Sequence, residues 1–251
     1  MTSTDIQDYI PEDQWPPVSA MLDGFGDQTL PASPALAGTT LSIPTHGGTA
    51  VEHVFKDPAT VAWDGGSAAY KAIEARPGIF IIDFVRGEGV DGENVTIVWD
   101  RNTGAVTTGI SRFVTVDGRI RSTTDFNAAH ERSSGLVGRR IFYRYSDVES
   151  YEHIYLNPGT FTWNCVRGGE AGLADTDRCM MWDVAEDLYI FFWTEKVMTV
   201  EAVLLIDLRE QRSIGRMFGW DDPAGEPVIL PFNSRLSVLN TTEYPQDTHK
   251  H

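Results

Sequence analysis

The sequence is poor in cysteine and has no long apolar run. Cys165 and Cys179 are its two cysteines. No stretch reaches the eighteen or so apolar residues that a membrane-spanning helix needs, and residues 1–5 lack the basic start and apolar core of a secretory signal. We therefore expect a cytoplasmic protein in which both thiols are free, with a disulfide between them as the open alternative.

Basic residues are also scarce. The chain has 20 Lys and Arg against 36 Asp and Glu among its 251 residues, a formal net charge of −16. Such a surface repels nucleic-acid phosphates and anionic lipid headgroups. We expect neither a nucleic-acid nor a membrane partner, but a small-molecule ligand or substrate. A homodimer stays open.

Motifs for metals, nucleotides and serine nucleophiles are missing. The sequence has no HExxH, no C-x-x-C and no G-x-S-x-G. The glycine-rich segment 166–178 lacks the Lys-Ser/Thr ending of a phosphate loop, and we interpret it as a lid over a barrel mouth. We expect no cofactor and no metal, although a site built from His153, Glu195 and an aspartate stays an alternative.

Aromatic residues are plentiful, at 7 Trp, 8 Tyr and 12 Phe, and most of the chain alternates apolar and polar residues as strands do. Short strands joined by turns, Asp117-Gly118 among them, favour antiparallel sheet. We predict a mainly β protein, an antiparallel barrel with an irregular N-terminal arm and a short helix at 67–75. An interruption at 126–134 is interpreted as a helical turn.

The segment 151–165, here called the aromatic hairpin, is the most informative stretch. Its Asn157-Pro158-Gly159 centre is a turn signal. Folding about that turn places Tyr155 opposite Phe161, His153 opposite Trp163, and Tyr151 opposite Cys165. Because alternate strand residues share a face, five rings and a thiol then lie together. They could line a cavity for a flat small molecule or simply fill a core.

A second strand, 188–196, places Tyr189, Phe191, Trp193 and Glu195 on one face. If that face points inward, desolvation raises the pKa of Glu195 and suits it to general acid–base work. The alternative is that Glu195 lies at a wet strand end, paired with Lys196 or an arginine.

A third strand, 140–145, alternates Ile141, Tyr143 and Tyr145 against Arg140, Phe142 and Arg144. The first face would bring phenol groups into a cavity, and the second would bring Arg144 as a clamp for a carboxylate. Without a bulge, this strand cannot supply both, and surface ion pairing is the commoner fate of an arginine.

Several of these segments resemble the MoaF family, named for molybdenum cofactor biosynthesis protein F. The resemblance spans most of the chain and is densest at 154–165 and 170–177, continuing through 188–196, 205–208, 213–215 and 218–219. It implies an N-terminal and a C-terminal MoaF module with calycin-like (lipocalin-related) barrel character. We place the arm and first strands at 1–60 and the two modules at 61–134 and 135–245, within one continuous barrel. The resemblance implies no set of catalytic residues.

These observations lead to a functional hypothesis: a cofactor-independent lyase or isomerase acting on a small aromatic or conjugated molecule inside the barrel. The expected catalytic residues are His153, Glu195 and Tyr143. The expected substrate-binding residues are Tyr145, Tyr151, Tyr155, Phe161, Trp163, Tyr189, Trp193 and Arg144. The alternatives are a non-catalytic carrier or sensor, and, from the family name alone, an accessory protein of molybdopterin biosynthesis.

Overall fold

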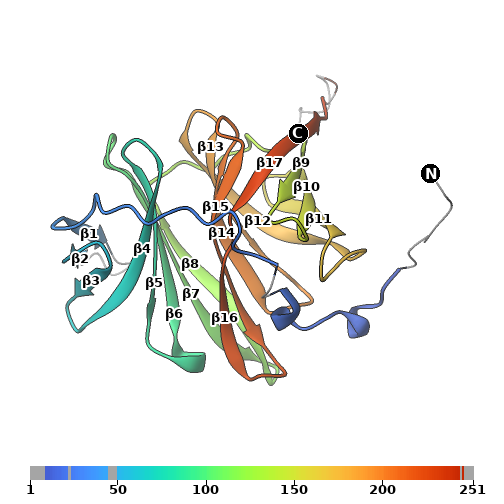
Figure 1. Cartoon of the computed structure of the whole chain (residues 1–251), viewed down its shortest axis with the longest axis horizontal. Helices are drawn as coiled ribbons and strands as arrows, with labels where there is room; N and C mark the ends of the chain where they lie inside the picture. The colour runs from blue at the N-terminus through green and yellow to red at the C-terminus, as the bar shows by residue number, and fades with distance from the viewer. Residues whose placement is uncertain (1–8, 22–23, 45–49, 244, 246–251) are drawn as a thin grey trace.

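The computed structural model describes residues 9–21, 24–44, 50–243 and 245, and antiparallel strands dominate it (Figure 1). The helical elements of this part of the chain are three 3-10 turns, η1 (Glu12–Gln14), η2 (Val18–Met21) and η3 (Gly89–Asp91). None of the described helices is long and apolar enough to cross a membrane. The mainly β, calycin-like fold class is confirmed.

The first strands form an eight-stranded sheet in sequence order, here called the N-terminal sheet. Asp117 and Gly118 join β7 and β8 with φ values of 50° and 75°, the left-handed geometry that a tight hairpin turn needs. The strands are β1 (Thr40–Pro44), β2 (Ala50–Phe55), β3 (Thr60–Trp63), β4 (Gly66–Arg76), β5 (Ile79–Arg86), β6 (Glu93–Asp100), β7 (Val106–Val116) and β8 (Arg119–Ala128).

The remaining strands form a closed C-terminal barrel. Its ring closes because β14 pairs with β15, β15 with β17 and β17 with β9, and β16 extends β15 outside the ring. The strands are β9 (Arg139–Arg144), β10 (Ser150–Asn157), β11 (Thr160–Arg167), β12 (Ala174–Ala185), β13 (Leu188–Thr194), β14 (Val200–Asp207), β15 (Arg212–Asp221), β16 (Glu226–Pro231) and β17 (Ser234–Thr241).

The expectation of one continuous barrel is wrong, because the strands form two sheets. Strand β9 pairs with β10 on one side and β17 on the other, so the barrel offers β8 no free edge. The expected boundary at 60/61 falls inside β3, within the first sheet, whereas the boundary at 134/135 falls between β8 and β9.

The predicted helix at 67–75 is also wrong, because these residues belong to β4. Alternate residues of this strand enter two different cores: Tyr70 and Ala72 pack in one, and Ile73 and Ala75 in the other. Burial on both faces therefore outweighs the helix propensity of an alanine-rich segment. The helical turn expected at 126–134 is likewise absent, since β8 runs to Ala128 and Phe126 packs on Trp182 with ring centroids 4.7 Å apart.

One face of the N-terminal sheet packs against the outside of the barrel. Ile73, Ile79 and Ile81 of the sheet share a buried cluster with Ile190 and Leu205 of the barrel. This contact explains why β13 and β14 are buried on both faces, a pattern more typical of parallel sheets.

Two buried arginines connect the modules in opposite directions. Arg76 of β4 binds the Asp207 carboxylate of the barrel through Nη2–Oδ1 (2.6 Å) and Nε–Oδ2 (3.0 Å). Arg216 of β15 pairs with Glu201 inside its own sheet at 3.1 Å. Its remaining donors reach Ser111 Oγ (2.7 Å) and Thr96 Oγ1 (3.0 Å) of the N-terminal sheet. The two sheets therefore share a polar as well as an apolar interface.

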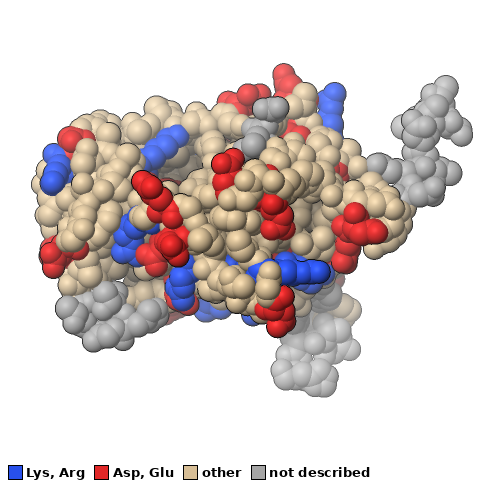
Figure 2. Space-filling model, turned by 90° about the horizontal axis from the view of Figure 1, so that it is seen from below, with Lys and Arg blue, Asp and Glu red and all other residues tan. Residues whose placement is uncertain are grey.

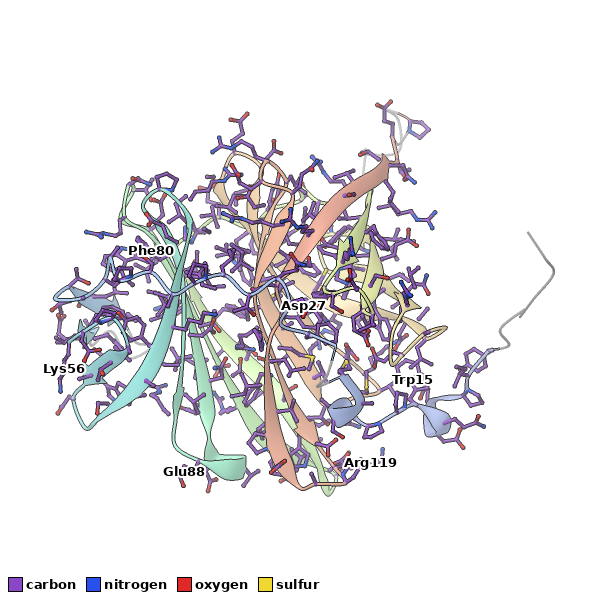
Figure 3. All side chains as sticks on the ribbon, in the orientation of Figure 1. Trp15, Asp27, Lys56, Phe80, Glu88 and Arg119 are labelled. Atoms are coloured by element: carbon purple, nitrogen blue, oxygen red, sulfur yellow. The ribbon has the colours of Figure 1, made fainter. Side chains whose placement is uncertain are left out.

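The N-terminal arm, described at residues 9–21 and 24–39, runs from the barrel across the molecule to β1 (Figure 1). Val18 and Met21 belong to the barrel core, whereas Leu36 belongs to the core of the N-terminal sheet. Trp15 lies at the barrel end of the molecule, far from Lys56 and Phe80 in the other half (Figure 3). The arm thus covers part of the barrel before the first strand begins.

Candidate functional site

The aromatic hairpin forms with the predicted register. Tyr155 pairs with Phe161, His153 with Trp163 and Tyr151 with Cys165 across β10 and β11. The Asn157 side chain stabilises the turn by accepting a hydrogen bond from the Gly159 N–H at 2.9 Å. Strand alternation and the turn signal were therefore sufficient to place these rings on one face, which points into the barrel.

His153 is enclosed by the rings. Its imidazole lies 4.5 Å from the Tyr143 ring, 5.1 Å from Phe161 and 5.6 Å from Trp193. Its Nδ1 is 3.3 Å from the Tyr155 hydroxyl. Burial lowers the pKa of His153 to about 3, so the imidazole is neutral at physiological pH. A group with this pKa is poorly matched to proton transfer near neutrality.

The space next to His153 is too small for an aromatic guest. The internal cavity has a volume of about 20 Å³, which is close to the minimum that holds one water molecule. Five of the expected site residues line this cavity: Tyr151, His153, Trp163, Trp193 and Glu195. The rest of its lining is Met21, Glu170, Met217 and Phe232. The expectation of a ligand inside the barrel is therefore wrong for this structure, because the rings pack against one another and the N-terminal arm fills the mouth.

The arm supplies three side chains to that mouth. Trp15 packs edge-to-face on Trp163 at 5.7 Å, Met21 reaches the internal cavity, and Phe25 stacks on Phe232 at 4.7 Å. The glycine-rich loop lies beside the arm, and a Cβ on Gly169 would be 3.1 Å from the Ala20 carbonyl oxygen. Both segments therefore close the same end of the barrel.

The strand β9 turns Tyr143 and Tyr145 inward and Arg144 outward. Arg144 is exposed and pairs with Asp147, so its expected role as a substrate clamp inside the barrel is wrong. The Tyr143 and Tyr155 hydroxyls bond each other at 2.6 Å, and Tyr145 Oη is enclosed without a partner. Five of the expected site residues line neither the internal cavity beside His153 nor the groove described below. They are Tyr143, Tyr145, Tyr155, Phe161 and Tyr189.

A group of carboxyls lies where the barrel mouth meets the arm. Tyr151 Oη donates to Glu170 Oε2 at 2.7 Å, and the Gly169 N–H donates to Glu149 Oε1 at 2.8 Å. Glu170 Oε1 and Glu149 Oε2 are enclosed without partners. Burial, together with the nearby Glu149 charge, raises the pKa of Glu170 to about 7. Glu170 therefore gains and loses its proton near neutral pH.

Glu195 is the member of this group that also faces outward. The residue is half-buried, its Oε2 is enclosed without a hydrogen-bond partner, and Trp193 Nε1 lies 3.5 Å from Oε1. Burial raises its pKa well above the ordinary value, and the charges of Glu170 and Asp177 raise it further. The predicted desolvated carboxyl beside a tryptophan is what the structure contains, and no cation pairs with it among the described residues.

Outside Glu195 a groove of about 500 Å³ runs between β8 and the barrel strands β12 and β13. Arg121, Arg178 and Lys196 bring positive charge to it, and Phe192 and Met180 bring apolar surface. Lys196 is paired with Asp175 at 2.7 Å. Glu195 therefore separates a water-sized internal cavity from a groove large enough for a small molecule.

Residues 13–115 match the MoaF N-terminal domain model and residues 130–242 match the MoaF C-terminal domain model. A curated relative, "Protein MoaF" of Klebsiella aerogenes, is 32% identical over 91% of this chain and 97% of its own length. The chain belongs to the MoaF family. The first match covers most of the N-terminal arm and strands β1 to β7 but not β8, and the second match covers the barrel strands β9 to β17.

A solved structure named "putative beta-lactamase", from Burkholderia vietnamiensis, aligns with 41% of this MoaF-family chain and 95% of its own. Its sequence identity is 19% and its TM-score is 0.35.

Sequence reasoning missed Glu170 and Glu149 as buried carboxyls and Arg121 as a cation of the groove. Glu170 lies in the glycine-rich loop, where no periodicity marks it as buried, and Arg121 comes from the other module. Across the described residues of this MoaF-family chain, no three His, Cys, Asp or Glu side chains converge on a metal position. Cys165 and Cys179 are free and buried, and burial raises the pKa of each thiol to about 12.

Proposed function

We propose that this MoaF-family protein is a cofactor-independent lyase or isomerase that binds a small conjugated carboxylic acid in the groove between its modules. One observation carries the proposal: Glu195, whose Oε2 is enclosed without a hydrogen-bond partner, is also one of the residues that line a groove of about 500 Å³. An acid–base catalyst needs a pKa nearer to neutral than an ordinary carboxyl has, and the environment of Glu195 supplies that shift.

The cations of the groove support an anionic substrate. Arg121 and Arg178 line it, and a guanidinium recognises a carboxylate through paired hydrogen bonds. Phe192 and Met180 offer apolar contact for the conjugated part of the molecule. Acidic and basic side chains are interspersed on the face shown in Figure 2, so the excess of acid does not form one repelling patch on that face.

In the proposed isomerisation, protonated Glu195 delivers its proton to one carbon of the conjugated system. The resulting carboxylate then removes a proton from the carbon two positions away from the protonated one, the double bond shifts by one position, and Glu195 regains its acid form. No electrons are gained or lost, so the step needs no redox partner. Glu170 helps by keeping the Glu195 pKa high through its nearby charge.

The test is hydrogen exchange at carbon. The protein in D₂O is given a panel of unsaturated and aromatic carboxylic acids, and proton NMR follows the loss of carbon-bound hydrogen. We expect Glu195→Gln to reduce exchange by about 100-fold or more, as loss of a general acid–base group does. The matched control Glu226→Gln, an exposed glutamate, should exchange at the wild-type rate. Wild-type exchange by Glu195→Gln contradicts the proposal, and saturable binding without exchange indicates a carrier instead.

A further inference from the structure

A further pocket lies in the N-terminal sheet, away from Glu195. Its volume is about 160 Å³, and its walls come from β1, β2, β5, β6, β7 and β8. The apolar part of the wall is aliphatic and consists of Ile43, Val51, Val95 and Ile110. The charged part consists of two ion pairs, Arg86–Glu93 and Arg112–Asp125, in which each acid is matched by a base. An apolar cavity of about 150 Å³ is large enough to bind benzene. By size, the pocket fits one ring.

Two polar groups in this wall lack hydrogen-bond partners. Thr108 is 4% exposed and its Oγ1 is enclosed and unpaired. Arg86 pairs with Glu93 through Nη2 at 2.8 Å, yet its Nε is enclosed and unpaired. An unmatched buried donor costs free energy unless something in the pocket accepts from it. Both groups can donate, so the missing partner is an acceptor.

His53 completes the wall on the β2 side. It is 4% exposed, and its Nδ1 is 3.1 Å from the Val51 carbonyl oxygen. Because a carbonyl only accepts, Nδ1 carries the proton. Its ring lies 5.8 Å from Phe84 and 6.2 Å from Trp63, so the strand is held by aromatic packing and the imidazole position is fixed.

We infer that this pocket binds a small monocyclic or short aliphatic carboxylate, with the apolar part against Ile43, Val95 and Ile110 and the carboxylate accepting from Thr108 and Arg86. A carboxylate has the two acceptor oxygens that two unpaired donors require. A ligand ammonium group can donate to Thr108 Oγ1, but it has no acceptor for the Arg86 Nε–H and leaves that buried donor unmatched. This binding site is separate from the groove at Glu195.

The probe is benzoate, followed by methyl NMR of the full chain. We expect benzoate to shift the methyl signals of Ile43, Val95 and Ile110 saturably, without shifting those of Ile190 and Ile214 at the module interface. Benzylammonium, with the same ring and the opposite charge, should bind at least about tenfold more weakly.

Thr108→Val keeps the shape of the side chain and removes its hydroxyl. We expect it to weaken benzoate binding about tenfold or more, as loss of a hydrogen bond to a charged group does, while Thr115→Val, an exposed threonine of the same strand, keeps wild-type affinity. Equal binding of benzylammonium, unchanged affinity of Thr108→Val, or no response of the pocket methyls each overturns the inference. A response of the Met180 and Met198 methyls alone places benzoate in the groove and also overturns it.

Discussion

At the scale of single residues, two neighbouring carboxyls differ in what surrounds them. Glu170 is sealed inside and accepts a hydrogen bond from Tyr151, whereas Glu195 reaches a groove open to small molecules. The raised pKa of each comes first from burial. Both carboxyls therefore hold their protons more tightly than usual, but Glu195 has access to the groove in which we propose that the substrate binds, and Glu170 does not.

The raised pKa of Glu170 predicts a stability change with pH. Between pH 4.5 and 7 the folded protein holds a proton on Glu170 that the unfolded chain has lost. Stability is therefore complete below pH 4.5 and decreases as the pH rises toward 7, by up to about 3 kcal/mol.

Glu170→Gln should remove this contribution and gain stability over wild type at pH 8 but not at pH 4. Urea unfolding of both proteins at the two values measures it, with Glu226→Gln as the exposed control. An equal gain at both pH values would mean that folding does not shift the pKa of Glu170.

The contribution of His153 to stability changes with pH in the opposite direction to that of Glu170. Its folded pKa of about 3 lies below the unfolded value of 6.5, so its contribution to stability is complete above pH 6.5 and is lost as the pH falls toward 3. We expect the His153 ring signals in nitrogen NMR to remain those of neutral imidazole from pH 5 to 8. A protonation midpoint inside that window contradicts the buried position described above.

At the scale of elements, the aromatic hairpin is a structural unit of the barrel core rather than a ligand wall. Its register followed from alternation about Asn157-Pro158-Gly159, which is why the sequence sufficed to predict it. The same alternation was present in β4 but was hidden by alanines that also suit a helix. The face of β9 was undecidable from the sequence, because both faces carry rings or aliphatic groups, and packing selected Tyr143 over Arg144.

Alanine substitutions at Phe161 and Val166 of β11 test whether the aromatic hairpin is part of the barrel core. Phe161 is fully buried and Val166 is 50% exposed. We expect Phe161→Ala to lower the free energy of unfolding by about 3–5 kcal/mol and Val166→Ala to change it by less than about 0.5 kcal/mol. Denaturant unfolding measures both. Similar small losses in the two variants would show that the hairpin rings are loosely packed.

At the scale of the whole molecule, the two MoaF modules behave as one body because their contacts are reciprocal. Arg76 of the sheet enters the barrel, and Arg216 of the barrel enters the sheet. The partners are separated by 131 residues in one case and by 105 in the other. No local pattern in the sequence links such distant residues, so the groove between the modules could not be predicted either.

Arg216→Met tests this connection. The variant leaves Glu201, which is completely buried, without its cation, and breaking a buried ion pair costs about 3–5 kcal/mol. The control Arg112→Met breaks an exposed pair with Asp125 and should cost at most about 1 kcal/mol. Thermal or urea unfolding compares them. Equal effects of the two variants would contradict a buried network between the modules.

The most direct test of the account is the titration of the Glu195 carboxyl, observed by carbon NMR of glutamate-labelled protein and assigned by the signal that Glu195→Gln removes. The account predicts a midpoint well above 4.5 that falls when Glu170 is changed to Gln, because the Glu170 charge helps to raise it. A midpoint near 4.5, unaffected by Glu170→Gln, would contradict the account, because Glu195 would then be an ordinary ionised carboxylate with no proton to deliver to the groove.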